Sequence, residues 1–150
     1  MNNELLLDMN EPLTGVEKDK LIGEAKELIH TIYQACENCE ADKLTATYLN
    51  SSDFISLING VIDDYEQTVK KYPVIMSDFK TQKASILKEK YVVLDASTIL
   101  YTSNSKWECE FQNGSFQVFE PVGVQLVLKK IDDKWHVLGW TEAYSSTPVN

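Results

Sequence analysis

Glu120 is the residue whose type and position most directly suggest chemistry. It shares the alternation of Phe116, Val118 and Val122 in a long apolar segment. A carboxyl group among such neighbours loses hydration, which raises its pKa and lets it act as a general acid or base. Pro121 leaves a second possibility open: proline cannot donate to a β-ladder, and a bulge there would turn Glu120 to solvent.

A set of aromatic residues could line a binding site. Aromatic rings cover apolar ligand surface, while a phenol O–H or an indole N–H orients a polar group. The alternative for each residue is that it fills the core. Together with Glu120, the candidates for ligand binding are Tyr33, Tyr48, Phe54, Tyr65, Trp107 and Trp140.

The cysteines and histidines do not form a recognisable reactive motif. Cys36 and Cys39 lie at the end of a predicted helix, on its apolar stripe, whereas redox-active pairs open a helix. A zinc site needs two further ligands, and Cys109 supplies one. We therefore expect buried core thiols, surface or hydrogen-bonded histidines at His30 and His136, and neither metal nor cofactor.

The charge balance disfavours polyanionic partners. Lys and Arg number 14 against 23 Asp and Glu, which gives a net charge of −9. The densest basic stretches are the pairs Lys70-Lys71 and Lys129-Lys130. Binding to phosphates needs clustered cations, so we expect no nucleic-acid partner and no attachment to an anionic membrane.

The sequence favours a cytoplasmic location. No segment approaches the ~18 apolar residues of a membrane span, and the start of the chain has no basic region typical of a signal peptide. Three cysteines, an odd number, argue against a disulfide framework and favour a reducing compartment. An exported parent whose signal peptide has been removed stays an open alternative.

The first half of the chain reads as helical. We expect a flexible arm over residues 1–15 and a single domain over residues 16–150. Apolar spacing of three and four predicts helical segments at Val16–Cys36, Asp42–Leu49 and Ile62–Tyr72. A short strand, Asp53–Ile58, separates the last two, and Pro73 is expected to end or kink the third helix.

After Thr81 the apolar period changes to two, which predicts a meandering sheet. The expected strands are Ser85–Asp95, Thr98–Phe111, Phe116–Lys130 and Trp135–Ser145. Turns are expected at Ala96-Ser97, Asn113-Gly114 and Asp132-Asp133. Helices followed by a sheet indicate an α+β domain, and Glu120-Pro121 marks a sharp bend in the longest strand.

This order of elements resembles the nuclear-transport-factor-2-like (NTF2-like) superfamily, and the SnoaL-like domains in particular. The resemblance rests on Tyr33-Gln34-Ala35-Cys36, on the strand from Phe54 to Gly60, and on Lys134-Trp135-His136-Val137. It implies a ketosteroid-isomerase-like, cystatin-like α+β roll. In such a roll three N-terminal helices pack on a strongly curved, mostly antiparallel sheet around a cone-shaped hollow.

The resemblance also bears on catalysis. It places Tyr33 where the isomerases have a tyrosine that donates to an oxyanion. Their catalytic Asp falls at Leu57, beside Ser56, and neither side chain can take a proton from carbon. The resemblance therefore contradicts steroid isomerisation, and the paired His and Asp of scytalone dehydratase find no counterpart either.

Three functions remain after these observations. The first is binding of a small, largely apolar molecule in the cone. The second is acid/base catalysis of the isomerase, dehydratase or cyclase type, with Glu120 as the acid or base and Tyr33 as the oxyanion donor. The third is association, as a homodimer formed through the sheet, which the resemblance to this superfamily implies.

Overall fold

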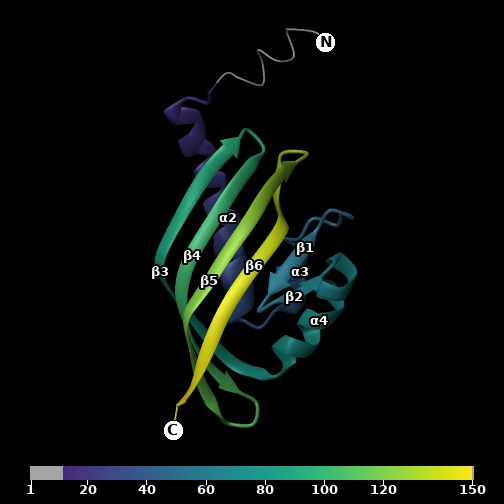
Figure 1. The fold of residues 1–150 in the computed structure, drawn as a ribbon, viewed down its shortest axis with the longest axis vertical. Helices are drawn as coiled ribbons and strands as arrows, with labels where there is room; N and C mark the ends of the chain where they lie inside the picture. Colours follow the sequence, from purple (N-terminus) through teal and green to yellow (C-terminus); the bar gives the residue numbers. More distant parts are fainter. Residues whose placement is uncertain (1–11, 150) are drawn as a thin grey trace.

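The computed structural model of the chain describes residues 12–149. Three helices and six strands follow one another as α2 Gly15–Glu37, α3 Ala41–Thr45, β1 Ile55–Ile58, β2 Val61–Asp63, α4 Tyr65–Ser77, β3 Phe79–Asp95, β4 Thr98–Phe111, β5 Phe116–Ile131 and β6 Lys134–Val149. The long strands curve around α2, while α3 and α4 lie beside β1 and β2 (Figure 1). This is the predicted α+β architecture.

The sheet is mostly antiparallel, as predicted. Its strand order is β2-β1-β6-β5-β4-β3. Strands β3 to β6 form an antiparallel meander, and β1 joins it by parallel pairing with β6. The predicted turn between β5 and β6 is confirmed, since Asp132 and Asp133 both have positive φ, at 50° and 60°.

Helix α2 supplies one wall of the interior. Thr14 caps it by accepting a hydrogen bond from the Glu17 amide at 3.1 Å. The apolar stripe is buried, at Leu21, Ala25, Ile29, Ile32 and Ala35. Of the predicted arm, residues 1–11 lie outside the described part of the chain, and Thr14 and Gly15 already belong to the start of α2.

Glu24 fixes α2 to the sheet. Its carboxylate accepts hydrogen bonds from the Trp135 indole N–H at 2.8 Å and from Lys130 at 2.9 Å. These two donors lower the pKa of Glu24 below its ordinary value. These hydrogen bonds fix the position of the helix relative to the β5–β6 hairpin.

The second helix is shorter than predicted. It ends at Thr45 instead of continuing to Leu49, because the backbone that follows forms hydrogen bonds with strand β6 instead. The Val137 amide donates to the Thr47 carbonyl at 2.8 Å, and the Leu49 amide donates to the Val137 carbonyl at the same distance.

The third helix was wrongly predicted to include Ile62. Strand β2, Val61–Asp63, instead pairs with β1 across a hairpin whose turn residues Asn59 and Gly60 have φ of 47° and 86°. Helix α4 then begins at Tyr65, because Asp64 and Gln67 form a capping box. The Gln67 amide donates to the Asp64 carboxylate at 2.8 Å.

Pro73 does not end the helix. Helix α4 continues through it to Ser77, where the buried Met76 packs in the core. Strand β3 then starts at Phe79, earlier than the predicted Ser85, since the Phe79 ring stacks on Phe111 of β4 with 4.8 Å between centroids. Helix α4 and β3 are therefore joined almost directly.

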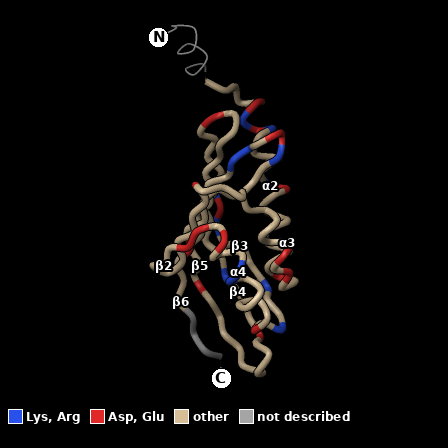
Figure 2. The backbone as a smooth tube through the Cα atoms, turned by 90° about the vertical axis from the view of Figure 1, so that its right-hand side faces the viewer, with Lys and Arg blue, Asp and Glu red and all other residues tan. Residues whose placement is uncertain are grey.

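Acidic positions surround the shorter helices. Figure 2 shows acidic backbone positions along α3 and at the start of α4. Basic positions also occur on both helices, at Lys43 of α3 and at Lys70 and Lys71 of α4, and the chain carries a net charge of −9. Two of these lysines pair with neighbouring acids, Lys43 with Glu40 and Lys71 with Asp63.

We expect Asp64→Ala to reduce the free energy of unfolding by about 1 kcal/mol, since it removes the side-chain acceptor that caps α4. Urea unfolding followed by circular dichroism measures this change. Lys70→Ala, on the exposed face of the same helix, is the matched control and should change stability by less than about 0.5 kcal/mol. Equal effects from both variants would show that the cap does not stabilise the helix.

Candidate functional site

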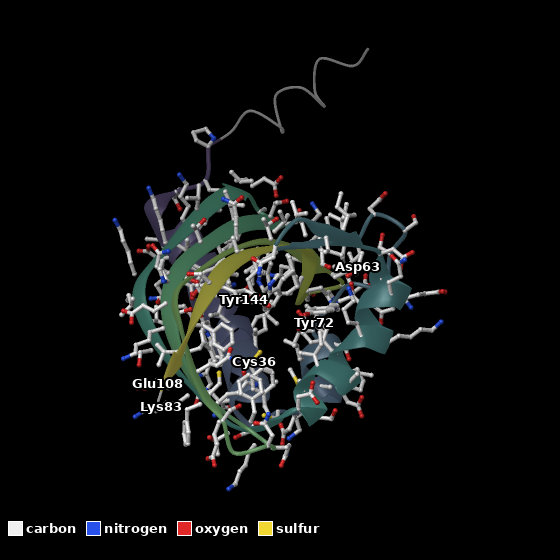
Figure 3. All side chains as sticks on the ribbon, turned by 60° about the horizontal axis from the view of Figure 1, so that its bottom comes forward. Cys36, Asp63, Tyr72, Lys83, Glu108 and Tyr144 are labelled. Carbon is white, nitrogen blue, oxygen red and sulfur yellow. The ribbon has the colours of Figure 1, made fainter. Side chains whose placement is uncertain are left out.

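Two adjoining hollows lie between the helices and the inner face of the sheet. The larger has a volume of about 150 Å³ and the smaller one of about 50 Å³. Cys36, Trp107, Trp140 and Glu142 line both. Figure 3 shows the larger hollow from its open end, where Cys36 of α2, Tyr72 of α4 and Tyr144 of β6 point toward a common space.

The walls of the larger hollow are mainly apolar and aromatic. Its aliphatic and thioether side chains come from α3, α4 and β5: Leu44, Ile75, Met76 and Val122. Its aromatic rings come from α4 and from every strand of the meander: Tyr72, Phe79, Trp107, Phe119, Trp140 and Tyr144. Such walls favour an apolar ligand surface over water.

Glu142 is the acidic residue of both hollows. Burial raises the pKa of its carboxyl to about 7, and the nearby Trp140 indole N–H partly opposes that rise. Among the residues that line the hollows in the described part of the chain, none is Lys, Arg or His. The carboxylate therefore has no cationic partner in the lining.

The backbone around Glu142 is held on both sides. On one side β6 pairs with β5, with Glu142 opposite Val124. On the other side the Asn59 amide donates to the Glu142 carbonyl at 2.9 Å, and the Asn59 side chain accepts from the Tyr144 amide at 2.9 Å. The turn between β1 and β2 thus fixes the position of the carboxyl-bearing segment.

Of the two alternatives for Glu120, the structure has the one in which a bulge at Pro121 turns it to solvent. Its side chain is exposed and lines neither hollow. The ladder between β5 and β6 slips between Phe119 and Val122, and this irregularity reverses the alternation, so that Phe119 faces inward before the bulge and Val122 after it. Glu120 stays on the solvent side.

Glu142 takes the place that the sequence had suggested for Glu120. A second register shift, between Val127 and Leu128 of β5, leaves Leu138 of β6 without a partner. The inward side of β6 therefore passes from Val137 to Trp140, and then to Glu142. The signal was present in the sequence, because Glu142 lies two residues beyond the candidate Trp140 on one strand.

Three of the predicted aromatic candidates line a hollow. Tyr33 lies in the smaller one and Trp107 and Trp140 in both. Tyr33 and Trp107 stack with 5.7 Å between ring centroids and an angle of 10°. The Tyr33 hydroxyl shares a hydrogen bond with the Ser103 hydroxyl at 3.3 Å, which fixes the phenol against β4.

The other three aromatic candidates belong to the core. Tyr48 and Phe54 are buried and stack with 5.2 Å between centroids, and Tyr65 meets the Phe54 ring edge-on. None of the three lines either hollow. They support the wall from behind, since Tyr48 also contacts the rings of Tyr72 and Trp140.

One buried donor in the wall is without a partner. The Trp140 indole N–H is inaccessible to solvent and makes no hydrogen bond of good geometry within the described residues, although the Glu142 carboxyl lies near it. A buried donor of this kind costs free energy unless something accepts from it. Because Trp140 and Glu142 line both hollows, a small shift of the carboxylate or an acceptor atom on a ligand could satisfy it.

The thiols in this region are held in the neutral form. Burial raises the pKa of Cys36 well above its ordinary value and that of Cys109 to about 11. Gln82 connects them, because its amide donates to the Cys36 carbonyl at 2.8 Å and its oxygen lies 3.8 Å from the Cys109 sulfur. Residues 12–149 contain no cluster of three or more potential metal ligands.

Neither the two histidines nor Ser56 and Leu57, where the isomerases have their catalytic base, add a reactive group. His30 is exposed, and burial lowers the pKa of the half-buried His136. Ser56 is buried and shares a hydrogen bond with the Thr68 hydroxyl at 3.3 Å, while Leu57 lies on the outer side. No carboxylate occupies either of these two positions.

Comparisons with known proteins identify the fold. No family model and no curated protein matches the sequence. Among solved structures, a candidate scytalone dehydratase from Novosphingobium aromaticivorans matches with a TM-score of 0.80 and 8% identity, over 91% of this chain and 93% of the other. A type 2 hexachlorocyclohexane dehydrochlorinase (LinA) matches with a TM-score of 0.76 and 8% identity, over 91% and 94%.

A third match is an NTF2-like protein of unknown function from Shewanella oneidensis, with a TM-score of 0.61 and 16% identity, over 81% of this chain and 98% of the other. The chain has the NTF2-like fold, as the resemblance in its sequence implied. At these identities the likeness concerns the fold.

The described residues include three helices, α2, α3 and α4. Within the described residues, none is long and apolar enough to cross a membrane.

We expect Glu142→Gln to stabilise the protein at pH 8 by up to about 3 kcal/mol, and to change stability little at pH 5. Between its ordinary value of 4.5 and about 7, the folded protein keeps a proton that the unfolded chain releases. Stability contributed by Glu142 is therefore lost as the pH rises through this window. The neutral amide avoids that loss.

Urea unfolding at both pH values measures the difference, with Glu120→Gln as the exposed control. The control should show no comparable pH dependence. A Glu142→Gln effect of the same size at pH 5 and pH 8 would contradict a raised pKa.

Proposed function

We propose that the chain binds a small, largely apolar molecule in the larger hollow. The observation that carries this proposal is a hollow of about 150 Å³ with apolar and aromatic walls and one carboxyl group. An engineered cavity of about this volume in another protein binds benzene. The volume and the open end fit a molecule with about one ring inside and a substituent extending outward.

The names of the structural neighbours support this proposal in a general way. They include a dehydrochlorinase named for hexachlorocyclohexane and a candidate scytalone dehydratase. The first of these names refers to a small organic molecule that contains one ring. The same fold also occurs in a protein of unknown function, so the support extends to a class of ligand size and not to a reaction.

Acid/base catalysis is a second candidate function, and Glu142 favours it. A carboxyl group with a pKa of about 7 inside an apolar hollow is suited to transfer protons at neutral pH. Glu120 cannot take this role, because it is exposed. Tyr33 and Glu142 both line the smaller hollow, which keeps Tyr33 as the accompanying oxyanion donor.

Two further expectations stay predictions. Association as a homodimer through the sheet is one, and a cytoplasmic location is the other. The cysteines support the second, because Cys36, Cys39 and Cys109 are free thiols.

We expect Ile75→Trp to weaken binding of fluorobenzene at least tenfold. Ile75 lies at the rim of the hollow and is 40% exposed, so the larger ring can be accommodated at the rim while it blocks the opening. Fluorine-19 NMR titration of the full chain measures the affinity.

Val74→Trp is the matched control. Val74 neighbours Ile75 on α4, is 68% exposed and does not line the hollow, so its variant should bind fluorobenzene as the parent does. Equal loss in both variants, or no saturable binding to the parent chain, would contradict the proposed site. Thermal unfolding of both variants confirms that they are folded.

We expect the parent chain to accelerate the elimination of 5-nitro-1,2-benzisoxazole, and Glu142→Gln to slow it at least a hundredfold. The Glu142 carboxylate takes the proton from the ring carbon, the N–O bond breaks, and the electron pair leaves on the oxygen as 2-cyano-4-nitrophenolate. Absorbance of this product measures the rate. The rate should rise with pH through an ionisation near 7. Equal rates in the parent and the variant would exclude Glu142 as a base.

A further inference from the structure

The charge pattern of the lining selects against anions. Glu142 is the charged side chain of the two hollows, and no Lys, Arg or His among the described residues lines either of them. An anionic ligand would face an uncompensated carboxylate in a poorly hydrated space, where like charges repel strongly. Where Glu142 is ionised, the lining therefore favours a neutral or cationic ligand over an anion.

The negative charge of Glu142 acts on groups of several surrounding elements. Burial, and secondly this charge, raises the pKa of Cys36 on α2, Tyr72 on α4 and Tyr144 on β6. Both causes also act on Tyr48, which precedes β1. Cys109 of β4 lines the hollow as a neutral thiol. None of these facing groups is a cation.

The walls are suited to a cation as well as to apolar surface. Six aromatic rings line the larger hollow, from Tyr72, Phe79, Trp107, Phe119, Trp140 and Tyr144. The face of an aromatic ring attracts an ammonium group, and desolvation strengthens this attraction. A carboxylate enclosed by aromatic rings combines both kinds of attraction for an organic cation.

We propose that the ligand of this hollow is a small organic amine, with its apolar body against the aromatic walls and its ammonium group paired with the Glu142 carboxylate. This inference rests on the proposed binding function and specifies its ligand class. The amine supplies the positive charge that the lining lacks. Because the bound cation favours the ionised carboxyl, it lowers the pKa of Glu142 below about 7.

The surface around the site agrees with this charge preference. Acidic positions lie along α3 and at the start of α4, and both helices contribute to the larger hollow (Figure 2). The net charge of the chain is −9. A net negative charge favours the approach of cations to the protein as a whole.

Three ligands of nearly equal shape test the proposal: 4-fluorobenzylamine, 4-fluorobenzyl alcohol and 4-fluorobenzoate. Their affinities for the full chain are measured by fluorine-19 NMR at pH 8, where Glu142 is ionised and the amine is protonated. We expect the amine to bind about tenfold or more tighter than the alcohol, and the benzoate to bind most weakly. At pH 5.5, where Glu142 is protonated, the preference for the amine should fall several-fold.

Glu142→Gln should bring the ratio of the alcohol and amine dissociation constants close to one. Glu120→Gln, on the solvent side of β5, should keep the ratio of the parent chain. Circular dichroism confirms that both variants are folded. Calorimetry at pH 7 in two buffers of different ionisation enthalpy should also show proton release when the amine binds to the parent chain, and none for Glu142→Gln.

The outcomes separate the two proposals. If the alcohol binds as tightly as the amine at pH 8, or if the preference for the amine persists in Glu142→Gln, the amine proposal is wrong while the binding function stands. If none of the three ligands binds, both proposals are wrong for molecules of this size.

Discussion

The alternation of side chains along a β-strand is the constraint on which this interior depends. Each residue faces opposite to its neighbour, so one unpaired residue transfers everything beyond it to the other face of the sheet. Two irregularities in the pairing of β5 with β6 change which residues face inward. One keeps Glu120 in solvent, and the other, at Leu138, brings Trp140 and Glu142 inside. The chemical character of the hollow is therefore set by two breaks in the hydrogen-bonding pattern.

The interior is divided between a filled part and an empty part. Around Tyr48 and Phe54 the aromatic rings pack on one another and form a core. Toward the open end, rings such as Trp107 and Phe119 line space instead of filling it. The packed rings thus support the wall of the hollow from the side of the core.

The fold was predictable because its signals are local and repeated. The helical spacing in α2, the period of two after Thr81 and the turn at Asp132-Asp133 all correspond to elements of the structure. The site was predictable in part. The types of residue pointed to a carboxyl and aromatic rings, but the choice between Glu120 and Glu142 depends on bulges. Strand pairing between distant segments decides where a bulge falls, and alternation alone does not reveal it.

The turn between β1 and β2 gives the carboxyl of Glu142 a particular character. Asn59 holds the Glu142 carbonyl and the Tyr144 amide from one side, while β5 holds the same segment from the other. A charge on a loose segment lowers its energy by swinging into water. This segment has no such freedom in its backbone, so ionisation stores electrostatic energy in the hollow. Protonation of the Glu142 carboxylate, or its pairing with a cation, would remove this electrostatic cost.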